Sequence, residues 1–201
     1  MSNYSVIFDL FGVVIDFDDA LVNRRISHHC DNPKDALQRL KDVVSTPDLI
    51  TGRIGLESLY LQIQKSLGLS ICFEEFTNLW LEPYSFPMDG MSDILKKLSN
   101  KYQLILLSNV DGVYWETIES RHKELEIFDV RLLSFEMGVS KPDRAAFLNA
   151  VSVSDAELPD CFFVDDKKEN IEVALSLGLK AHHFTGVPRL LTAFEEQSIE
   201  L

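Results

Sequence analysis

Short runs of consecutive apolar residues alternate with segments of helical periodicity over most of the chain. Such runs lie within residues 6–14, 104–107 and 161–164, a weaker strand is expected around residues 130–133, and a last strand is expected near residues 180–184. Continuous apolar runs of this length are typical of strands buried on both faces of a parallel sheet. Helical periodicity is expected near residues 91–98, 113–125, 144–151 and 169–177, between the later runs. Strands that alternate with helices predict the α/β class, with a parallel sheet flanked by helices.

The segment from residue 16 to residue 87 departs from this alternation, because its pattern is almost entirely helical. A helix is expected at 33–44 after Asp31-Asn32-Pro33, a second one ends at Gly68, and a third spans 73–80. The turn Pro87-Met88-Asp89-Gly90 precedes the return of alternating helices and strands. We therefore expect a core domain of residues 1–15 and 88–201, and a helical cap domain of residues 16–87 inserted after the first strand.

Composition and net charge limit the classes of molecule that this protein is expected to bind. The chain has 201 residues, 46% of them hydrophobic, and a net charge of −13, which disfavours nucleic-acid and anionic-membrane partners. An anionic substrate would need a metal ion or a lysine to hold it. No signal segment, membrane-length apolar run or cysteine pairing pattern occurs, so a cytoplasmic location is expected. A monomer and a homodimer both stay open.

Polar residues follow the predicted strands, where each strand ends or in the loop after it. They are Asp9, Ser108, Asn109, Lys141, Asp165 and Asp166. The carboxyl ends of parallel strands meet at one edge of the sheet, which is where ligands bind in open α/β folds. Each signal alone is ordinary, since turns and helix caps use the same residue types. Together they predict a site in which carboxylates bind Mg²⁺ and a lysine binds an anion.

With these residues in place, the chain resembles the haloacid dehalogenase-like hydrolase superfamily. Within it, the chain is most similar to the phosphatase subfamily with a helical cap, of the bacterial sugar-1-phosphate phosphatase type. The resemblance rests on four motifs in order: Phe-Asp9-Leu-Phe-Gly-Val-Val, Leu-Leu-Ser108-Asn109, Ser-Lys141-Pro-Asp, and Phe-Val-Asp165-Asp166 with Asn170. It implies a Rossmann-like sheet with an inserted helical cap.

The resemblance also implies a reaction and a role for each residue. The reaction is Mg²⁺-dependent hydrolysis of a small phosphorylated metabolite, with a sugar phosphate, including anomeric ones, as the expected class. Asp9 would form an aspartyl-phosphate intermediate. The implied metal ligands are Asp9, the backbone carbonyl of Phe11, Asp165 and Asp166. Ser108, Asn109 and Lys141 would bind the phosphoryl group and assist catalysis.

Phe11 departs from the pattern of most phosphatases in this superfamily. They carry a second aspartate there, which protonates the leaving group, and such acid–base help is worth roughly 10²–10⁴-fold in rate. The absence of this aspartate should slow the hydrolysis of substrates with good leaving groups least. Two alternatives stay open: a 2-haloacid dehalogenase, which also has an aromatic residue there, and a non-catalytic binding protein of the same fold. The retained Asp165-Asp166 pair argues against a metal-free dehalogenase.

The sequence does not identify the substrate, because it does not show which side chains of the cap face the site. Trp80, Tyr84 and Trp115 are candidates for stacking on a sugar, although core packing is the commoner use of such residues. Arg24 and Arg25 could meet a substrate anion, but salt bridges on a solvated face are the simpler expectation.

Overall fold

A computed structural model describes residues 4–44, 46–82 and 85–201. Five parallel strands form its main sheet, in the order β5-β4-β1-β6-β7. They are β1 (Ser5–Phe8), β4 (Gln103–Ser108), β5 (Val130–Leu133), β6 (Cys161–Asp165) and β7 (Lys180–His183). The parallel α/β sheet predicted from the apolar runs is confirmed, and β1 is its central strand.

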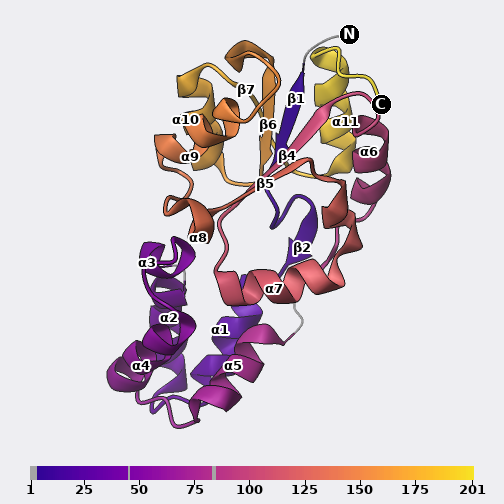
Figure 1. Cartoon of the computed structure of the whole chain (residues 1–201). Helices are drawn as coiled ribbons and strands as arrows, with labels where there is room; N and C mark the ends of the chain where they lie inside the picture. Colours follow the sequence, from indigo (N-terminus) through magenta and orange to yellow (C-terminus); the bar gives the residue numbers. More distant parts are fainter. Residues whose placement is uncertain (1–3, 45, 83–84) are drawn as a thin grey trace.

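Helices cover both faces of this sheet (Figure 1). α9 (Arg144–Ser152) and α10 (Lys168–Leu177) lie on one face, and α6 (Met91–Leu98) and α11 (Val187–Glu196) on the other. Successive residues of a strand point to opposite faces. Phe163 of β6 accordingly packs on Phe147 of α9, with ring centroids 5.3 Å apart, and Phe162 on Phe194 of α11, at 5.5 Å. The continuous apolar run of β6 therefore serves two cores.

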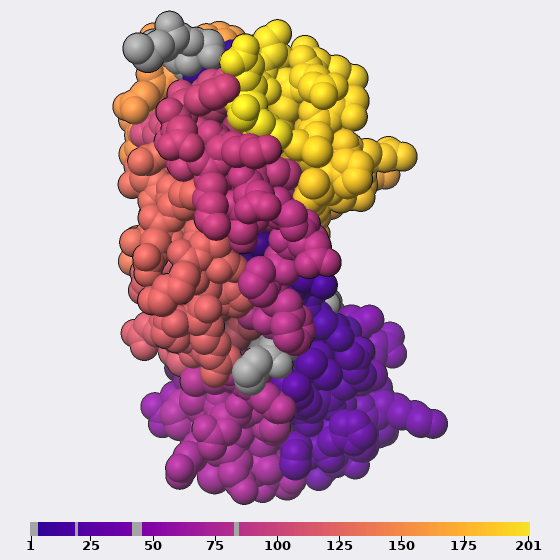
Figure 2. Space-filling model, turned by 90° about the vertical axis from the view of Figure 1, so that its right-hand side faces the viewer, coloured from indigo at the N-terminus to yellow at the C-terminus, as the bar shows by residue number. Residues whose placement is uncertain are grey.

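The helices between residues 19 and 81 form a separate lobe below the sheet (Figure 1). They are α1 (Asp19–Ser27), α2 (Pro33–Val44), α3 (Pro47–Ile50), α4 (Leu56–Leu67) and α5 (Phe73–Leu81). α4 buries the apolar stripe predicted for it and ends at Gly68, whose φ of 64° suits glycine. Figure 2 shows this lobe at one end of an elongated molecule and the C-terminal segment at the other.

Two short strands join the lobe to the sheet domain. β2 (Ile15–Phe17) and β3 (Ser85–Pro87) pair in antiparallel fashion, with Asp16 opposite Phe86. The sequence pattern does not predict this ribbon, and it places a turn leading into a helix at residues 16–19 instead. Three residues are too few to show a period, and the pairing partners are 70 residues apart. The helix itself begins at Asp19, as that pattern suggests.

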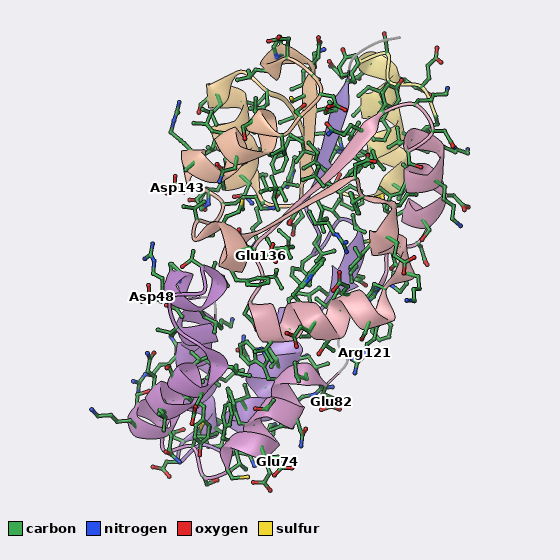
Figure 3. All side chains as sticks on the ribbon, viewed as in Figure 1. Asp48, Glu74, Glu82, Arg121, Glu136 and Asp143 are labelled. Carbon is green, nitrogen blue, oxygen red and sulfur yellow. The ribbon has the colours of Figure 1, made fainter. Side chains whose placement is uncertain are left out.

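The lobe touches the sheet domain at two further places. At the first, α3 packs against α8 (Ser134–Met137), and the buried Ser134 hydroxyl donates a hydrogen bond to the Ile50 carbonyl. At the second, α5 packs against α7 (Gly112–Arg121). Figure 3 shows Asp48 of the lobe beneath α8, and Glu82 near Arg121 of α7. These contacts hold the lobe over the carboxyl end of the sheet.

The remaining elements are two 3₁₀ turns, Lys123–Ile127 before β5 and Leu158–Asp160 before β6. None of the helices within the described ranges has the length and apolarity needed to cross a bilayer.

Candidate active site

Asp9 follows the central strand directly and is 6% exposed. Its backbone N–H still donates to the Val164 carbonyl of the neighbouring strand β6, at 2.9 Å. The chain turns after this point, and the Leu10 N–H donates to Oδ1 of Asp9 at 2.7 Å. The strand thus fixes the backbone of Asp9, and the turn fixes the orientation of its carboxylate.

Lys141 lies against Asp9, although 132 residues separate them in sequence. Its Nζ is 2.6 Å from Oδ1 of Asp9 and 2.8 Å from Oδ2 of Asp165, and the side chain is almost completely buried. Asn109 positions the backbone of Lys141: its Nδ2 donates to the Lys141 carbonyl at 2.7 Å, and its Oδ1 accepts from the Lys141 N–H at 2.9 Å. The ends of β4 and β6 are thereby joined to the lysine loop.

Asp165 is held more tightly than any other carboxylate described in the site. Nδ2 of Asn170 is 2.9 Å from both of its oxygens, and the Lys167 N–H donates to Oδ1 at 2.8 Å. Asp166 lies closer to solvent and lines the cavity. One oxygen from each of Asp9, Asp165 and Asp166 falls within a group whose members are all within 4.8 Å of one another. Three carboxylates therefore converge on one point.

The charges in this cluster perturb one another strongly. Burial, reinforced by the Asp165 carboxylate, raises the pKa of Asp9 to about 7 against the opposing effect of Lys141. Burial alone would lower the pKa of Lys141, but the carboxylates of Asp9 and Asp165 outweigh it and raise that pKa. Burial and the nearby Asp165 also raise the pKa of Asp166. One buried ammonium does not neutralise three carboxylates, so the cluster favours an additional cation.

The donor set fits a magnesium ion. Mg²⁺ takes oxygen ligands and is commonly held by a few carboxylates together with water and substrate oxygens. Oδ1 of Asp166 is buried and has no hydrogen-bond partner among the described residues, which is the state expected of an oxygen reserved for a ligand.

Gly12 provides the space that this arrangement needs. Its φ is +77°, and a Cβ added to it would lie 2.8 Å from Oδ2 of Asp166. Both the backbone conformation and the close approach require glycine. His183 contributes from the other side, because its Nε2–H donates to the Asp166 carbonyl at 2.9 Å. Sequence reasoning assigned no site role to either residue.

A cavity of about 530 Å³ opens onto this cluster, within the size range of small-molecule sites. Five of the residues predicted from the sequence line it: Asp9, Phe11, Asn109, Lys141 and Asp166. Asp165 lies behind them and contacts Lys141. Ser108 is fully buried at the end of β4, outside that lining, and its hydroxyl has no partner among the described residues.

Phe11 occupies the position of the missing aspartate with an aromatic ring. Its centroid lies 4.5 Å from that of Phe17 and 6.2 Å from that of Tyr114. Its side chain thus belongs to an aromatic cluster beside Asp9. The proposed metal contact of its backbone carbonyl stays a prediction.

The other candidates lie as follows. Trp80 lines the cavity, whereas Trp115 is buried outside that lining, and Tyr84 lies outside the described residues. Arg24 pairs with Asp18 at 2.8 Å and Arg25 with Glu82 at 3.2 Å, and neither belongs to the lining.

Comparison with known proteins shows which family the chain belongs to. The family model described as "Haloacid dehalogenase-like hydrolase" matches residues 6–184. The D-ribitol-5-phosphate phosphatase of Bacteroides thetaiotaomicron is 25% identical over 183 residues, covering 88% of this chain and 89% of the relative.

Two solved structures share the fold. A predicted HAD-like family hydrolase from Porphyromonas gingivalis has a TM-score of 0.80 and 21% identity, with 100% of each chain covered. A HAD family enzyme from Bacteroides thetaiotaomicron, solved with magnesium and inorganic phosphate, has a TM-score of 0.75 and 22% identity, with 91% of this chain and 94% of that one covered. Because the family model matches most of the sequence, the chain belongs to the haloacid dehalogenase-like hydrolase family.

Proposed function

We propose that this protein is a Mg²⁺-dependent phosphatase that hydrolyses a small phosphorylated metabolite through an aspartyl-phosphate on Asp9. The observation that carries the proposal is the position of Asp9. It lies at the floor of the cavity, 2.6 Å from the Lys141 ammonium and within 4.8 Å of two further carboxylates. A nucleophile, a cation and an acidic metal site are the parts that phosphoryl transfer to a carboxylate requires.

The relatives support the same chemistry. The curated relative from Bacteroides thetaiotaomicron is named as a phosphatase of a sugar-alcohol phosphate, and the fold neighbour holds both magnesium and phosphate. Residues 16–87 would act as the cap domain, because side chains of this segment contribute to the lining of the cavity.

The contacts in the site and the resemblance to the family together give each residue a proposed role. Asp9 attacks phosphorus, and Asp9, Asp165, Asp166 and the Phe11 carbonyl would hold Mg²⁺. When bound, the ion offsets the negative charge of the phosphoryl group and the carboxylates. Lys141 contacts the transferring oxygens, and Asn109 positions Lys141 by its two hydrogen bonds. Ser108 lies outside the cavity lining, with its hydroxyl buried and unpartnered among the described residues, and its contact with a phosphoryl oxygen stays a prediction from the resemblance.

The ring of Phe11 provides no proton for the leaving group. Good leaving groups should therefore react fastest, and this dependence should be steeper than in relatives that carry the aspartate. A sugar phosphate, and the anomeric kind in particular, remains a prediction from the sequence.

The experiment is phosphate release from an aryl phosphate, acetyl phosphate, glucose 1-phosphate and glucose 6-phosphate, with Mg²⁺ or EDTA. We expect release that needs Mg²⁺ and falls by roughly 10³-fold or more in Asp9→Asn, because the nucleophile is lost. Asp16→Asn is the matched control, since Asp16 lies on β2 and accepts a hydrogen bond only from its neighbour Phe17 among the bonds described.

Release that persists in Asp9→Asn would contradict the proposal. Absence of release from every compound of the panel, with Mg²⁺ bound, would favour the non-catalytic alternative. Halide release from a 2-haloacid without metal would favour the dehalogenase.

A further inference from the structure

The part of the lining that the 16–87 segment contributes is apolar throughout. Its described members are Phe17, Val22, Pro47, Ile50 and Trp80. We call these five residues the apolar roof. The floor beneath them is polar, with Asp9, Lys141 and Asp166. A phosphate ester bound with its phosphorus at Asp9 would place its organic group against the roof.

The polar groups next to the roof are already committed to one another. The Trp80 indole N–H donates to Oδ2 of Asp111 at 3.3 Å, and Oδ1 of Asp111 accepts from the Tyr114 N–H at 2.9 Å. Arg24 and Arg25 form ion pairs within the lobe and do not reach the cavity lining. Ser140, Lys167 and Glu169 also line the cavity, but they belong to the sheet domain and not to the roof. A polyol bound against the roof would therefore lose hydrogen bonds to water and recover few from the roof itself, at a cost for each unpaired hydroxyl.

The aromatic residues continue the apolar surface down to the nucleophile. Phe11, two residues after Asp9, packs against Phe17 of the roof, and Tyr114 lies 6.2 Å from both ring centroids. Phe11 and Phe17 are only partly buried, so both present surface to the cavity. Phe11, which stands where most related phosphatases have the catalytic aspartate, thus contributes to the apolar surface of the cavity.

We propose that the substrate is a phosphate monoester whose organic group is apolar, an alkyl or aryl phosphate, instead of a sugar or polyol phosphate. This inference rests on the proposed phosphatase function and specifies its substrate class. Binding of the organic group beneath the roof removes apolar surface from water on both sides. Each buried methylene should therefore favour the reaction about fourfold, until the chain fills the cavity.

The test compares phosphate esters of primary alcohols, so that leaving-group chemistry does not explain the result. We would measure kcat/KM for ethyl, butyl and hexyl phosphate, and for glycerol 3-phosphate and ribitol 5-phosphate. Neighbouring hydroxyls make a polyol the better leaving group, so leaving-group chemistry alone predicts that polyol phosphates react faster. The apolar roof predicts the reverse, with hexyl phosphate exceeding ethyl phosphate and both polyol phosphates by about tenfold or more.

A variant of the apolar roof and a matched control test whether the preference for longer alkyl groups comes from the roof. Ile50→Asn should lower the hexyl-to-ethyl ratio of kcat/KM several-fold, because a polar side chain replaces apolar surface of the roof. Leu61→Asn makes the same kind of change at a 53% exposed leucine of α4 that lies outside the lining, and should leave the ratio unchanged. Urea unfolding of both variants would show that each is folded under assay conditions.

The outcomes separate the two proposals. Turnover of acetyl phosphate that depends on Asp9, with no rise from ethyl to hexyl or with faster polyol phosphates, would overturn the substrate class alone. Absence of phosphate release from every compound, acetyl phosphate included, would overturn the phosphatase function and this inference with it. An unchanged ratio in Ile50→Asn would show that the preference does not come from the roof.

Discussion

At the scale of single residues, Gly12 matters as much as the charged side chains around it. Asp166 approaches the backbone of Gly12 so closely that any Cβ would displace its carboxylate. The other two carboxylates of the cluster are held by donors: Leu10 N–H and Lys141 for Asp9, and Asn170, Lys167 N–H and Lys141 for Asp165. The position of the Asp166 carboxylate thus depends on the absence of a side chain at Gly12.

Gly12→Ala should therefore weaken Mg²⁺ binding by about 10–100-fold, as when a group that orients a metal ligand is changed. It should also destabilise the fold by about 1–2 kcal/mol, because alanine is strained at a φ of +77°. Calorimetric titration with Mg²⁺ measures the first effect and urea unfolding the second.

Gly138→Ala is the matched control. Gly138 has a φ of +70°, and among the described residues no atom beyond its own helix and its chain neighbours lies within 4 Å of the Cβ position. This variant should show the loss of stability without the loss of affinity. Equal Mg²⁺ affinities in the two variants would refute the role assigned to Gly12.

The sequence predicts the charged residues of the site because each follows a strand, and strand ends converge in a parallel sheet. It also points to Asn170 through the fourth motif. It does not reveal the contact of Gly12 with Asp166, since a glycine in a turn has many uses. The aromatic packing of Phe11 against Phe17 depends on β2 and is equally hidden.

At the scale of elements, the α3–α8 contact fixes part of the roof. The Ser134 hydroxyl donates to the Ile50 carbonyl and accepts from the Val110 N–H at 3.0 Å. Ser134 is fully buried, so these groups have no access to water through it. A single hydroxyl thereby joins the lobe, the loop after β4 and α8.

Ser134→Ala should leave the Ile50 carbonyl and the Val110 N–H unpaired and cost about 1–3 kcal/mol of unfolding free energy. Hydrogen exchange should accelerate at Thr51 and Gly52, whose N–H groups bond within α3. Ser152→Ala is the control, because the Ser152 hydroxyl is bonded only to its own helix among the described contacts. Equal stabilities and equal exchange rates in the two variants would show that the contact does not hold the lobe.

Elements with a clear local sequence pattern were predictable, and short elements without such a pattern were not. α4, with its apolar stripe and terminal glycine, and the strands β1, β4 and β6 carry clear local signals. β2, β3, α3 and α8 have three or four residues each, and tertiary contacts decide their conformation. The apolar roof depends on these short elements, which explains why the sequence left the substrate class open.

At the scale of the whole molecule, a net charge of −13 surrounds a site that must accept an anion. Lys141 is paired with Asp9 and Asp165, and Asp166 lies close by. Binding of an anion there would therefore need a bound cation as well as the lysine. The lobe supplies apolar surface to the cavity, and the sheet domain supplies its charged residues. The cytoplasmic location and the choice between monomer and homodimer stay predictions.

In the proposed mechanism, Asp9 attacks phosphorus and forms a covalent intermediate. The most direct measurement is the stereochemical course of phosphoryl transfer from an ester whose phosphorus is made chiral with oxygen isotopes. Two successive in-line displacements, first by Asp9 and then by the acceptor, predict net retention of configuration at phosphorus. Net inversion would reveal a single displacement by water and would contradict the account.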